Sequence, residues 1–511
     1  MSVAKASFQQ LLGLDERRWD AASVGFLANL ECVAQTSPEI AAAIVRELRD
    51  QRANLKLIAS ENYSSLAVQA AMGNLLTDKY AEGVSGARYY AGCDNVDEIE
   101  SRAAQLACEL FGAEHAYVQP HSGADANLVA FWAILRARRE VDAVAKKLGL
   151  EAGKAPTIAD WQKLSTQQWD EIRHALADER LLALDFSCGG HLTHGYRLNV
   201  SSRMFQAHSY TVDRTTGLLD YDVIERQAEE LRPLILLAGF SAYPRNIDYR
   251  RMRAIADKVG AVLMVDMAHF AGLVAGGVLQ GDYNPITFAD VVTSTTHKTL
   301  RGPRGGIVLC KREFQEHVDK GCPMILGGPL PHVMAAKAVC FREALTPEFK
   351  AYARRIVDNS QALAAACAQQ GIKVHTGTTE NHIVQLDMRP LKLTGFQSEA
   401  ALRQCGVTLN RNALPFDTEP PLIASGLRLG SAAISTLGMG PGEMSEIAAI
   451  IGLVLKNLSP ATAKSGQPSK REFLLADAVR AEAVGRVKTL LNQFPVYPTL
   501  NLPLLEARFG A

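Results

Sequence analysis

The chain has 511 residues, and its 54 basic residues are balanced by 54 acidic ones, which gives a formal net charge of zero. This balance gives no support to long-range attraction to nucleic acid or to an anionic membrane, and we predict neither as a partner. The sequence contains no run of about 18 apolar residues, so a transmembrane helix is not expected. The N-terminal segment lacks the apolar core of a secretory signal, which leads us to expect a cytoplasmic protein.

The nine cysteines are scattered along the chain and form no CxxC pair. An odd number without paired spacing fits neither a disulfide framework nor a zinc site. We therefore expect free cysteines in a reducing compartment, and we predict no bound metal.

Helical and strand-like patterns alternate along much of the chain. Apolar residues at helical spacing predict a helix over residues 37–54, and a second helix is expected to begin after Asn95, as its N-cap, and to end at Gly112. Short apolar runs and one further helical pattern predict strands at 115–119, 234–238, 261–266, 289–295 and 305–309, and a helix at 249–259. Because strands alternate with helices, we predict an α/β fold with a largely parallel sheet.

Residues 137–180 interrupt this alternation. They are rich in charge and contain two tryptophans, and they are interpreted as a helical insertion. After residue 330 the pattern turns helical and then strand-like over 372–388. The segment PATAKSGQPSK at 460–470 predicts a linker, and a final helix is expected to lead to residues 494–498.

The pair Asp266 and Lys298 carries the first chemical signal. Asp266 ends a buried apolar run, so it is expected at the carboxyl edge of a strand, where open α/β sheets bind ligands. Lys298 follows the next predicted strand. Enzymes that use pyridoxal phosphate need a lysine that holds the cofactor as a Schiff base and a carboxylate that pairs with its pyridinium nitrogen. The alternative is that Lys298 is an ordinary surface lysine and Asp266 a structural aspartate, because the two residues alone do not distinguish these cases. The glycine-rich turn after Lys298 favours the cofactor site, because it lets a bulky cofactor approach the backbone.

Three further motifs supply groups for such a cofactor and its substrate. Ser122 and Gly123, before a predicted helix, are typical of a phosphate site at a helix N-terminus, although an ordinary capped turn has the same pattern. His191 in GGHLTHG is suited to stack on a ring. His194 also allows a metal site, which ranks lower because no third ligand is evident. Arg428 in SGLRLG is suited to hold a carboxylate through two parallel hydrogen bonds.

Tyrosines and a carboxylate crowd the segment DKYAEGVSGARYYAG at 78–92, which contains Tyr80, Glu82, Tyr89 and Tyr90. A carboxylate among aromatic rings is a candidate acid–base group, because such surroundings raise its pKa. The alternative is a loop whose tyrosines cover an interface.

Together these segments resemble the serine hydroxymethyltransferase family closely. The resemblance runs from about residue 37 to about residue 498. The matching stretches occur in the family's order and are IASENY (58–63), KYAEG (79–83), RYY (88–90), QPHSGADAN (119–127), GGHLTHG (189–195), VDMAHFAGLVAGGV (265–278), TTHKTLRGPRGG (295–306), GGPLPHVMAAKA (327–338) and SGLRLG (425–430).

The resemblance implies the fold of type I pyridoxal phosphate enzymes. Its large domain would contain a mixed, mainly parallel seven-stranded sheet, followed by a smaller C-terminal α/β domain. We expect an N-terminal arm at residues 1–62, the large cofactor-binding domain at 63–330 and the small domain with its tail at 331–511. Active sites of such enzymes form between two subunits, so a homodimer or homotetramer is implied.

The resemblance also implies the roles of individual residues. Catalytic roles would fall to Lys298, which holds the cofactor, Asp266 at the ring nitrogen, His191 on the ring, and Glu82 as the acid–base group. The other cofactor contacts would be Ser122, Gly123, Ser241, His269 and His297, with Tyr80 and Gly328 reaching across the subunit interface. The amino-acid carboxylate would meet Arg428, Ser60 and Tyr90, and tetrahydrofolate would meet Tyr89, Leu192 and Asn412.

The implied reaction transfers the hydroxymethyl carbon of L-serine reversibly to tetrahydrofolate as co-substrate, giving glycine and 5,10-methylenetetrahydrofolate. Two alternatives stay open: a folate-independent aldolase acting on 3-hydroxy amino acids, and a non-catalytic relative. Glu82, Tyr89 and Asn412 favour the folate enzyme over the aldolase, whereas Lys298 and Arg428 argue against a non-catalytic protein.

The sequence departs from the family pattern at three places. Ala124 stands where many members have a serine hydroxyl for the phosphate. The stretch 137–180 is inserted between the phosphate loop and the His191 loop. Residues 322–326, CPMIL, lack the glycine-rich run that is common before GGPL.

Overall fold

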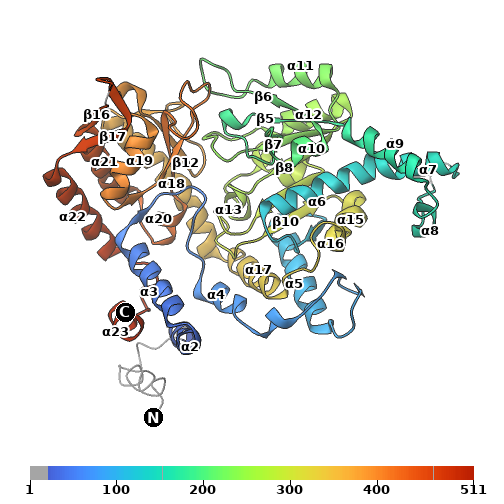
Figure 1. The fold of residues 1–511 in the computed structure, drawn as a ribbon, viewed down its shortest axis with the longest axis horizontal. Coiled ribbons are helices and arrows are strands. Elements are labelled where there is room, and N and C mark those ends of the chain that lie inside the picture. Colours follow the sequence, from blue (N-terminus) through green and yellow to red (C-terminus); the bar gives the residue numbers. More distant parts are fainter. Residues whose placement is uncertain (1–20, 152–153, 464, 511) are drawn as a thin grey trace, which may run out of the picture.

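The structure is a computed structural model that describes residues 21–151, 154–463 and 465–510. It contains a large sheet with its helices and a smaller sheet with its own, and N-terminal helices lie beneath the smaller sheet (Figure 1). Within the described part of the chain, no helix combines the length and the apolar character needed to cross a bilayer.

The large sheet has seven strands in the order β4, β10, β9, β8, β7, β5, β6. β10 is antiparallel to both of its neighbours, and β5 to β9 pair in parallel. The strands are β4 (His115–Tyr117), β5 (Arg180–Leu184), β6 (Gln206–Tyr210), β7 (Ile235–Gly239), β8 (Val262–Asp266), β9 (Val291–Thr295) and β10 (Gly306–Cys310). The prediction of a mixed, mainly parallel seven-stranded sheet is confirmed.

Helices bury both faces of this sheet. Along β8, Val262 and Met264 join one hydrophobic cluster, whereas Leu263 and Val265 join another on the opposite face. This alternation follows from the two-residue period of a strand, and it explains why the central strands are continuous apolar runs. The helices of this part are α5 (Asp94–Phe111), α6 (Gly123–Leu135), η4 (Phe186–Cys188), α10 (Ser201–Met204), α11 (Tyr221–Leu231), α12 (Tyr249–Val259), α13 (Ala271–Ala275), η5 (Gly281–Tyr283), α14 (Pro285–Phe288), α15 (Arg312–Asp319) and α16 (Gly321–Met324).

The predicted start of α5 is wrong by a short distance. Its N-cap is Cys93, no side chain caps it, and Asn95 lies inside the helix. The helix ends as predicted, because Gly112 adopts the left-handed conformation (φ 74°) that favours glycine.

A four-stranded antiparallel sheet forms the second core, in the order β11 (Lys373–Val374), β12 (Ile383–Asp387), β15 (Gly426–Gly430), β14 (Asn410–Asn412). Helix α18, together with α19 and α21, packs its buried residues into the same core. The helices that follow residue 330 are α17 (Pro331–Ala344), α18 (Pro347–Gln369), η6 (Arg389–Leu391), α19 (Gly395–Gln404), α20 (Ala432–Thr436), α21 (Pro441–Lys456), α22 (Asp477–Gln493) and α23 (Leu502–Phe509).

The N-terminal segment is fastened to the C-terminal part of the chain. Strand β1 (Leu55–Lys56) pairs in parallel with β13 (Val407–Thr408). Glu31 accepts two hydrogen bonds from Arg508, at 2.8 and 3.0 Å, so the first and last described helices are joined directly. The elements of this segment are α2 (Ala21–Thr36), α3 (Pro38–Ala53), α4 (Leu66–Met72), η2 (Leu75–Asp78), β2 (Gly83–Val84) and β3 (Ala87–Arg88). The domain boundaries at residues 62 and 330 stay a prediction.

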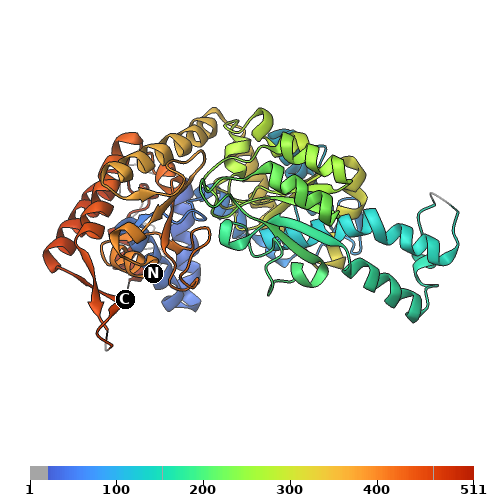
Figure 2. The same cartoon turned by 90° about the horizontal axis from the view of Figure 1, so that it is seen from above.

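Two segments project from the body (Figure 2). The helical pattern predicted for 137–180 is found as η3 (Arg136–Glu140, a π-helix), α7 (Val141–Leu148), α8 (Ile158–Trp161) and α9 (Thr166–Ala177). The linker predicted at 460–470 is wrong, because residues 460–462 and 468–470 lie in two paired strands, β16 (Leu458–Thr462) and β17 (Pro468–Leu475). The side-chain amide of Gln397 donates to the carbonyls of Ser469 and Glu472, which holds the hairpin on α19.

Candidate active site

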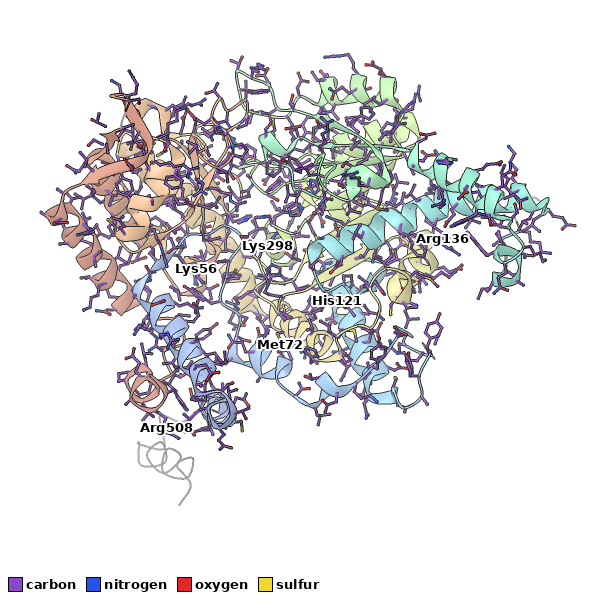
Figure 3. The ribbon with its side chains drawn as sticks, viewed as in Figure 1. Lys56, Met72, His121, Arg136, Lys298 and Arg508 are labelled. Carbon is purple, nitrogen blue, oxygen red and sulfur yellow. The ribbon has the colours of Figure 1, made fainter. Side chains whose placement is uncertain are left out.

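A cavity of about 520 Å³ opens beyond the carboxyl ends of the parallel strands, and Asp266 and Thr295, which end β8 and β9, both line it. Its size suits a cofactor together with a small substrate. Eleven of the residues selected from the sequence line it: Ser60, Ser122, Gly123, His191, Leu192, Ser241, Asp266, His269, His297, Lys298 and Arg428. Figure 3 shows Lys298 near the middle of the molecule, well away from Arg136 at the base of the projecting helices.

Lys298 is a buried amine, with 8% of the residue exposed. Burial lowers its pKa to about 8, although the Asp266 carboxylate acts in the opposite direction, and Arg428 and Arg304 lower the pKa further. Its backbone is also held, because the Asn62 amide donates to the Lys298 carbonyl at 2.9 Å. A lysine with this pKa has an appreciable neutral fraction near neutral pH and is therefore nucleophilic.

Asp266 is the centre of a buried hydrogen-bond network. Burial raises its pKa, but hydrogen bonds and nearby histidines outweigh burial and hold the pKa below its usual value. The Asn127 amide donates to Oδ2 at 2.9 Å, His194 Nε2 lies 3.1 Å from the same oxygen, and the backbone N–H of Ala268 donates to Oδ1 at 3.0 Å. Asp266 is therefore a fixed carboxylate aimed into the cavity.

The same network orients His191. Its Nδ1 lies 2.8 Å from the Thr193 hydroxyl, which also accepts from the Asn127 amide at 2.7 Å. Burial lowers the pKa of His191 to about 4, so the ring is neutral near pH 7. The sequence offered no third ligand beside His191 and His194, but the structure brings Asp266 within 4.8 Å of both. In this arrangement His194 and Asp266 are already at hydrogen-bond distance from one another.

The loop before α6 has the geometry of an anion site, but its donors are partly engaged. Ser122 caps the helix by accepting from the Asp125 backbone at 3.2 Å, and its hydroxyl donates to the Asp125 carboxylate at 2.9 Å. A Cβ on Gly123 would lie 2.6 Å from a methyl group of Thr295, so only glycine fits there. His297 also lines the cavity, and its Nδ1 is buried and has no hydrogen-bond partner among the described residues.

Arg428 lies on β15, in the smaller sheet, and reaches across to the cavity. Its Nε donates to the Asn410 side chain at 3.0 Å, and one terminal nitrogen donates to the Ser241 carbonyl at 2.6 Å. Burial lowers its pKa to about 10, which leaves the guanidinium charged at neutral pH. Two fixed contacts preorganise this cation beside the cavity.

The remaining selected residues do not line the cavity: Tyr80, Glu82, Tyr89, Tyr90, Gly328 and Asn412. The hydroxyls of Tyr80 and Tyr90 donate to opposite oxygens of Glu82, at 3.4 and 3.3 Å, and their rings meet edge to face at 5.3 Å. Gly328 belongs to the same cluster, since a Cβ there would lie 3.2 Å from the Tyr80 ring. Three of the six, Tyr80, Tyr89 and Tyr90, are strongly exposed, at 58%, 65% and 48%.

Comparison with known proteins identifies the family. Residues 33–154 and 161–451 match the family model described as serine hydroxymethyltransferase. Three relatives of that name come from Treponema pallidum, Cutibacterium acnes and Chlamydia trachomatis. They are 60%, 52% and 46% identical over 489, 474 and 492 residues, which covers 96%, 93% and 96% of this chain and 84%, 95% and 97% of theirs.

The chain belongs to the serine hydroxymethyltransferase family. Serine hydroxymethyltransferases are fold type I enzymes that depend on pyridoxal phosphate and use tetrahydrofolate as co-substrate. The residues of the cavity fit this cofactor, because a buried amine, a fixed carboxylate and an unpartnered His297 nitrogen converge there.

Several residues of the site were not predicted from the sequence. Asn127 and Thr193 hold Asp266 and His191 in place, and Arg304 lines the cavity. Asn127 lies in the matched stretch 119–127, four residues after Gly123, so helical spacing was a usable signal. Arg304 lies within the stretch that follows Lys298, but an arginine in a turn is not distinctive by itself.

Proposed function

We propose that this chain catalyses the reversible transfer of the hydroxymethyl carbon of L-serine to tetrahydrofolate, with glycine and 5,10-methylenetetrahydrofolate as products. The observation that carries the proposal is the convergence of Lys298, Asp266 and Arg428 on one cavity. Pyridoxal phosphate, when bound, acts as an electron sink for the α-carbon of an amino acid. The roles of the protein's own residues follow from their positions and charge states.

Lys298 would link to the cofactor through its amine, which burial keeps partly neutral. Asp266 would hold the proton on the pyridine nitrogen, because its carboxylate stays ionised in its hydrogen-bond network. His191 would lie against the ring in its neutral form. Ser122, Gly123 and His297 would contact the phosphate, and Ser241 and His269 would complete the cofactor site.

Arg428 would bind the carboxylate of serine or glycine, together with Ser60. Fixing that carboxylate fixes the orientation of the bonds at the α-carbon, and orientation supplies a large share of the rate enhancement in such reactions. The burial of Arg428 strengthens this interaction, because charge pairs weaken in water.

We infer that the protein is a homodimer or homotetramer in which the tyrosine–glutamate cluster serves a neighbouring copy. The cluster comprises Tyr80, Glu82, Tyr90 and Gly328; its two tyrosines are exposed, and it lies outside the cavity of its own chain. Glu82 would exchange protons with the serine hydroxyl, and Tyr90 would help to bind the amino acid. Tyr89, Leu192 and Asn412 would meet the folate.

A reducing compartment such as the cytoplasm agrees with the state of the cysteines. All nine lie in the described part of the chain, and all are free thiols. Disulfides form and persist in oxidising compartments and are rare in the cytosol.

The test is glycine formation from L-serine by the purified, pyridoxal phosphate-loaded protein, with and without tetrahydrofolate. We expect glycine and 5,10-methylenetetrahydrofolate to appear in equal amounts and only when folate is present. Equal rates of serine cleavage without folate would replace the proposal by a folate-independent aldolase. Failure to bind pyridoxal phosphate would point to a non-catalytic protein.

A further inference from the structure

Lys337 is a fully buried lysine that the proposed function leaves unexplained. It lies on α17, with 1% of the residue exposed, and does not line the cavity. Its Nζ donates to three backbone carbonyls: those of Val118 at 2.5 Å, Pro120 at 2.9 Å and Gly306 at 2.8 Å.

The three acceptors match a charged ammonium group. An ammonium has three N–H donors and no lone pair, so three carbonyls satisfy it completely. A neutral amine has only two N–H donors and would direct its lone pair at the oxygen of the third carbonyl, which is repulsive. Burial lowers the pKa of Lys337 to about 7, while Glu100 and Asp125 act at longer range to raise it. We interpret the geometry as that of the charged form, because the contacts leave no acceptor unused.

Two of the carbonyls that Lys337 binds, those of Val118 and Pro120, belong to the loop between β4 and α6, and the third, that of Gly306, belongs to β10. Val118 and Pro120 lead directly into Ser122 and Gly123, the residues assigned to the cofactor phosphate. The backbone N–H of Gly306 also donates to the Pro120 carbonyl at 2.9 Å, so this one oxygen joins the loop both to β10 and to Lys337 on α17. Glycine at position 305 leaves space for the Lys337 side chain, because a Cβ there would lie only 2.6 Å from Lys337 Cε.

The charge balance at this loop gives Lys337 a second task. The phosphate of the cofactor is an anion, yet the Asp125 carboxylate lies in the first turn of α6 and accepts a hydrogen bond from the Ser122 hydroxyl. Ala124 offers no hydroxyl in exchange. Lys337 takes part in none of the ion pairs found among the described residues, and the carboxylates of Glu100 and Asp125 act on it only at longer range.

We propose that Lys337 is a positioning residue for the cofactor phosphate, which fixes the loop 118–123 from beneath and offsets the negative charge of Asp125. The inference rests on the proposed function, in which the phosphate lies at Ser122 and Gly123. It accounts for a buried cation that touches neither the substrate nor the cofactor ring.

The experiment compares the affinities of the apoprotein for pyridoxal phosphate and for pyridoxal, which has the same ring and aldehyde but no phosphate. Two variants are used: Lys337→Gln keeps two donors without the charge, and Lys337→Met removes both. We expect the dissociation constant of pyridoxal phosphate to rise by about tenfold or more in both, the size of one unit charge acting through protein. The dissociation constant of pyridoxal should stay within about twofold, because that ligand has no phosphate to attract.

Lys311→Gln is the matched control. Lys311 directly follows β10, at the end opposite to Gly306, and its side chain is 39% exposed. It should leave both affinities unchanged. Unchanged phosphate selectivity in the Lys337 variants, or equal weakening of both ligands, would overturn the inference while the proposed function stands. If the wild-type protein itself binds the two ligands equally, the proposed phosphate site fails first.

Gly305→Ala covers the case in which neither Lys337 variant folds. The added methyl group displaces the end of the Lys337 side chain and removes no hydrogen-bonding group. A selective loss of pyridoxal phosphate affinity is again expected, and an unchanged ratio of the two affinities would count against the inference.

Discussion

The floor of the cavity and the tyrosine–glutamate cluster serve the same proposed reaction, but the chain builds them in opposite ways. Lys298 and Asp266 are 8% and 7% exposed and line the cavity of their own chain, whereas Tyr80 and Tyr90 are 58% and 48% exposed and do not line it. Groups whose chemistry depends on desolvation are thus completed by folding alone. The tyrosine–glutamate cluster, by contrast, would need a neighbouring copy of the chain before it could act at a cavity.

The exposed cluster is nevertheless fixed in shape. Arg88 joins Asp97 at 2.7 Å and Glu100 at 2.5 Å, and it donates to the carbonyls of Ala81 and Gly83 at 2.9 Å. A loop that is held in this way loses little further entropy when a second subunit covers it. The two regions therefore differ in solvent exposure but not in preorganisation.

The largest effect is expected at the cavity floor. Lys298→Ala removes the only amine that lines the cavity in the described chain and should lower the rate of folate-dependent serine cleavage by at least about a thousandfold. The measurement is the steady-state rate together with the visible absorbance of lysine-linked pyridoxal phosphate, which should be lost. The control, Lys311→Gln, should retain full activity, and a Lys298→Ala protein with near-normal activity would contradict the assignment.

The second effect separates the two regions. Glu82→Gln removes the proposed acid–base group and should lower the rate by about a hundredfold or more, with little change in cofactor binding. The Glu82→Gln and Lys298→Ala chains are mixed in equal amounts, unfolded and refolded together. If Glu82 acts in the cavity of a neighbouring copy, this mixture should recover about a quarter of the wild-type activity, because half of the dimers then contain one intact site of two. A mixture as inactive as either variant would place Glu82 in its own chain's reaction.

Sequence reasoning succeeded where the physics is local. The strands β7 to β10 are buried along their whole length and each contains an apolar run, whereas the edge strand β6 (QAHSY) is buried only at Tyr210 and gave no such signal. The hairpin at 458–475 was missed because its proline and serine content resembles a linker; the ladder tolerates Pro460 only with a shift of register.

The site was predictable in its residue types but not in its assembly. Motifs identify Lys298 and Arg428, but not that Arg428 comes from the other sheet and rests on the Ser241 carbonyl. Nor does sequence reveal that the cluster around Glu82 lies outside the cavity, since local pattern carries no information on tertiary distance. Lys337 has no local signal, because its role depends on carbonyls from two distant segments.

A third effect concerns stability and is confined to the buried region. The rings of His269 and His382 are buried and stacked, with His269 Nδ1 3.2 Å from His382 Nε2. Burial lowers the pKa of His382 to about 3 and that of His269 well below its usual value. The unfolded chain takes up these protons near pH 6.5, whereas the folded chain does not, so stability is complete above pH 6.5 and is lost as the pH falls toward the folded pKa. At about pH 5.5 each histidine should cost about 1 kcal/mol of unfolding free energy.

The measurement is urea unfolding of the apoprotein at two pH values on either side of 6.5. His382→Gln should show a smaller loss of stability on acidification than the wild type, since one of the two groups no longer titrates. An identical loss in both proteins would mean that other groups control the acid sensitivity.

The smallest effect is expected on the KM values of the two substrates. Substitutions at two asparagines of β14, Asn410 and Asn412, should separate the amino-acid end of the site from the folate end. The side chain of Asn410 accepts from Arg428 Nε at 3.0 Å, whereas that of Asn412 donates to the Ala413 carbonyl and does not contact Arg428. Asn410→Ala should raise the KM for serine by about three- to tenfold with little change in kcat, because Arg428 keeps its bond to Ser241 but loses one restraint. Asn412→Ala should instead raise the KM for tetrahydrofolate and leave that for serine unchanged. Equal effects of both substitutions on both constants would mean that β14 acts only as a scaffold, and that the two ends of the site are not separated along this strand.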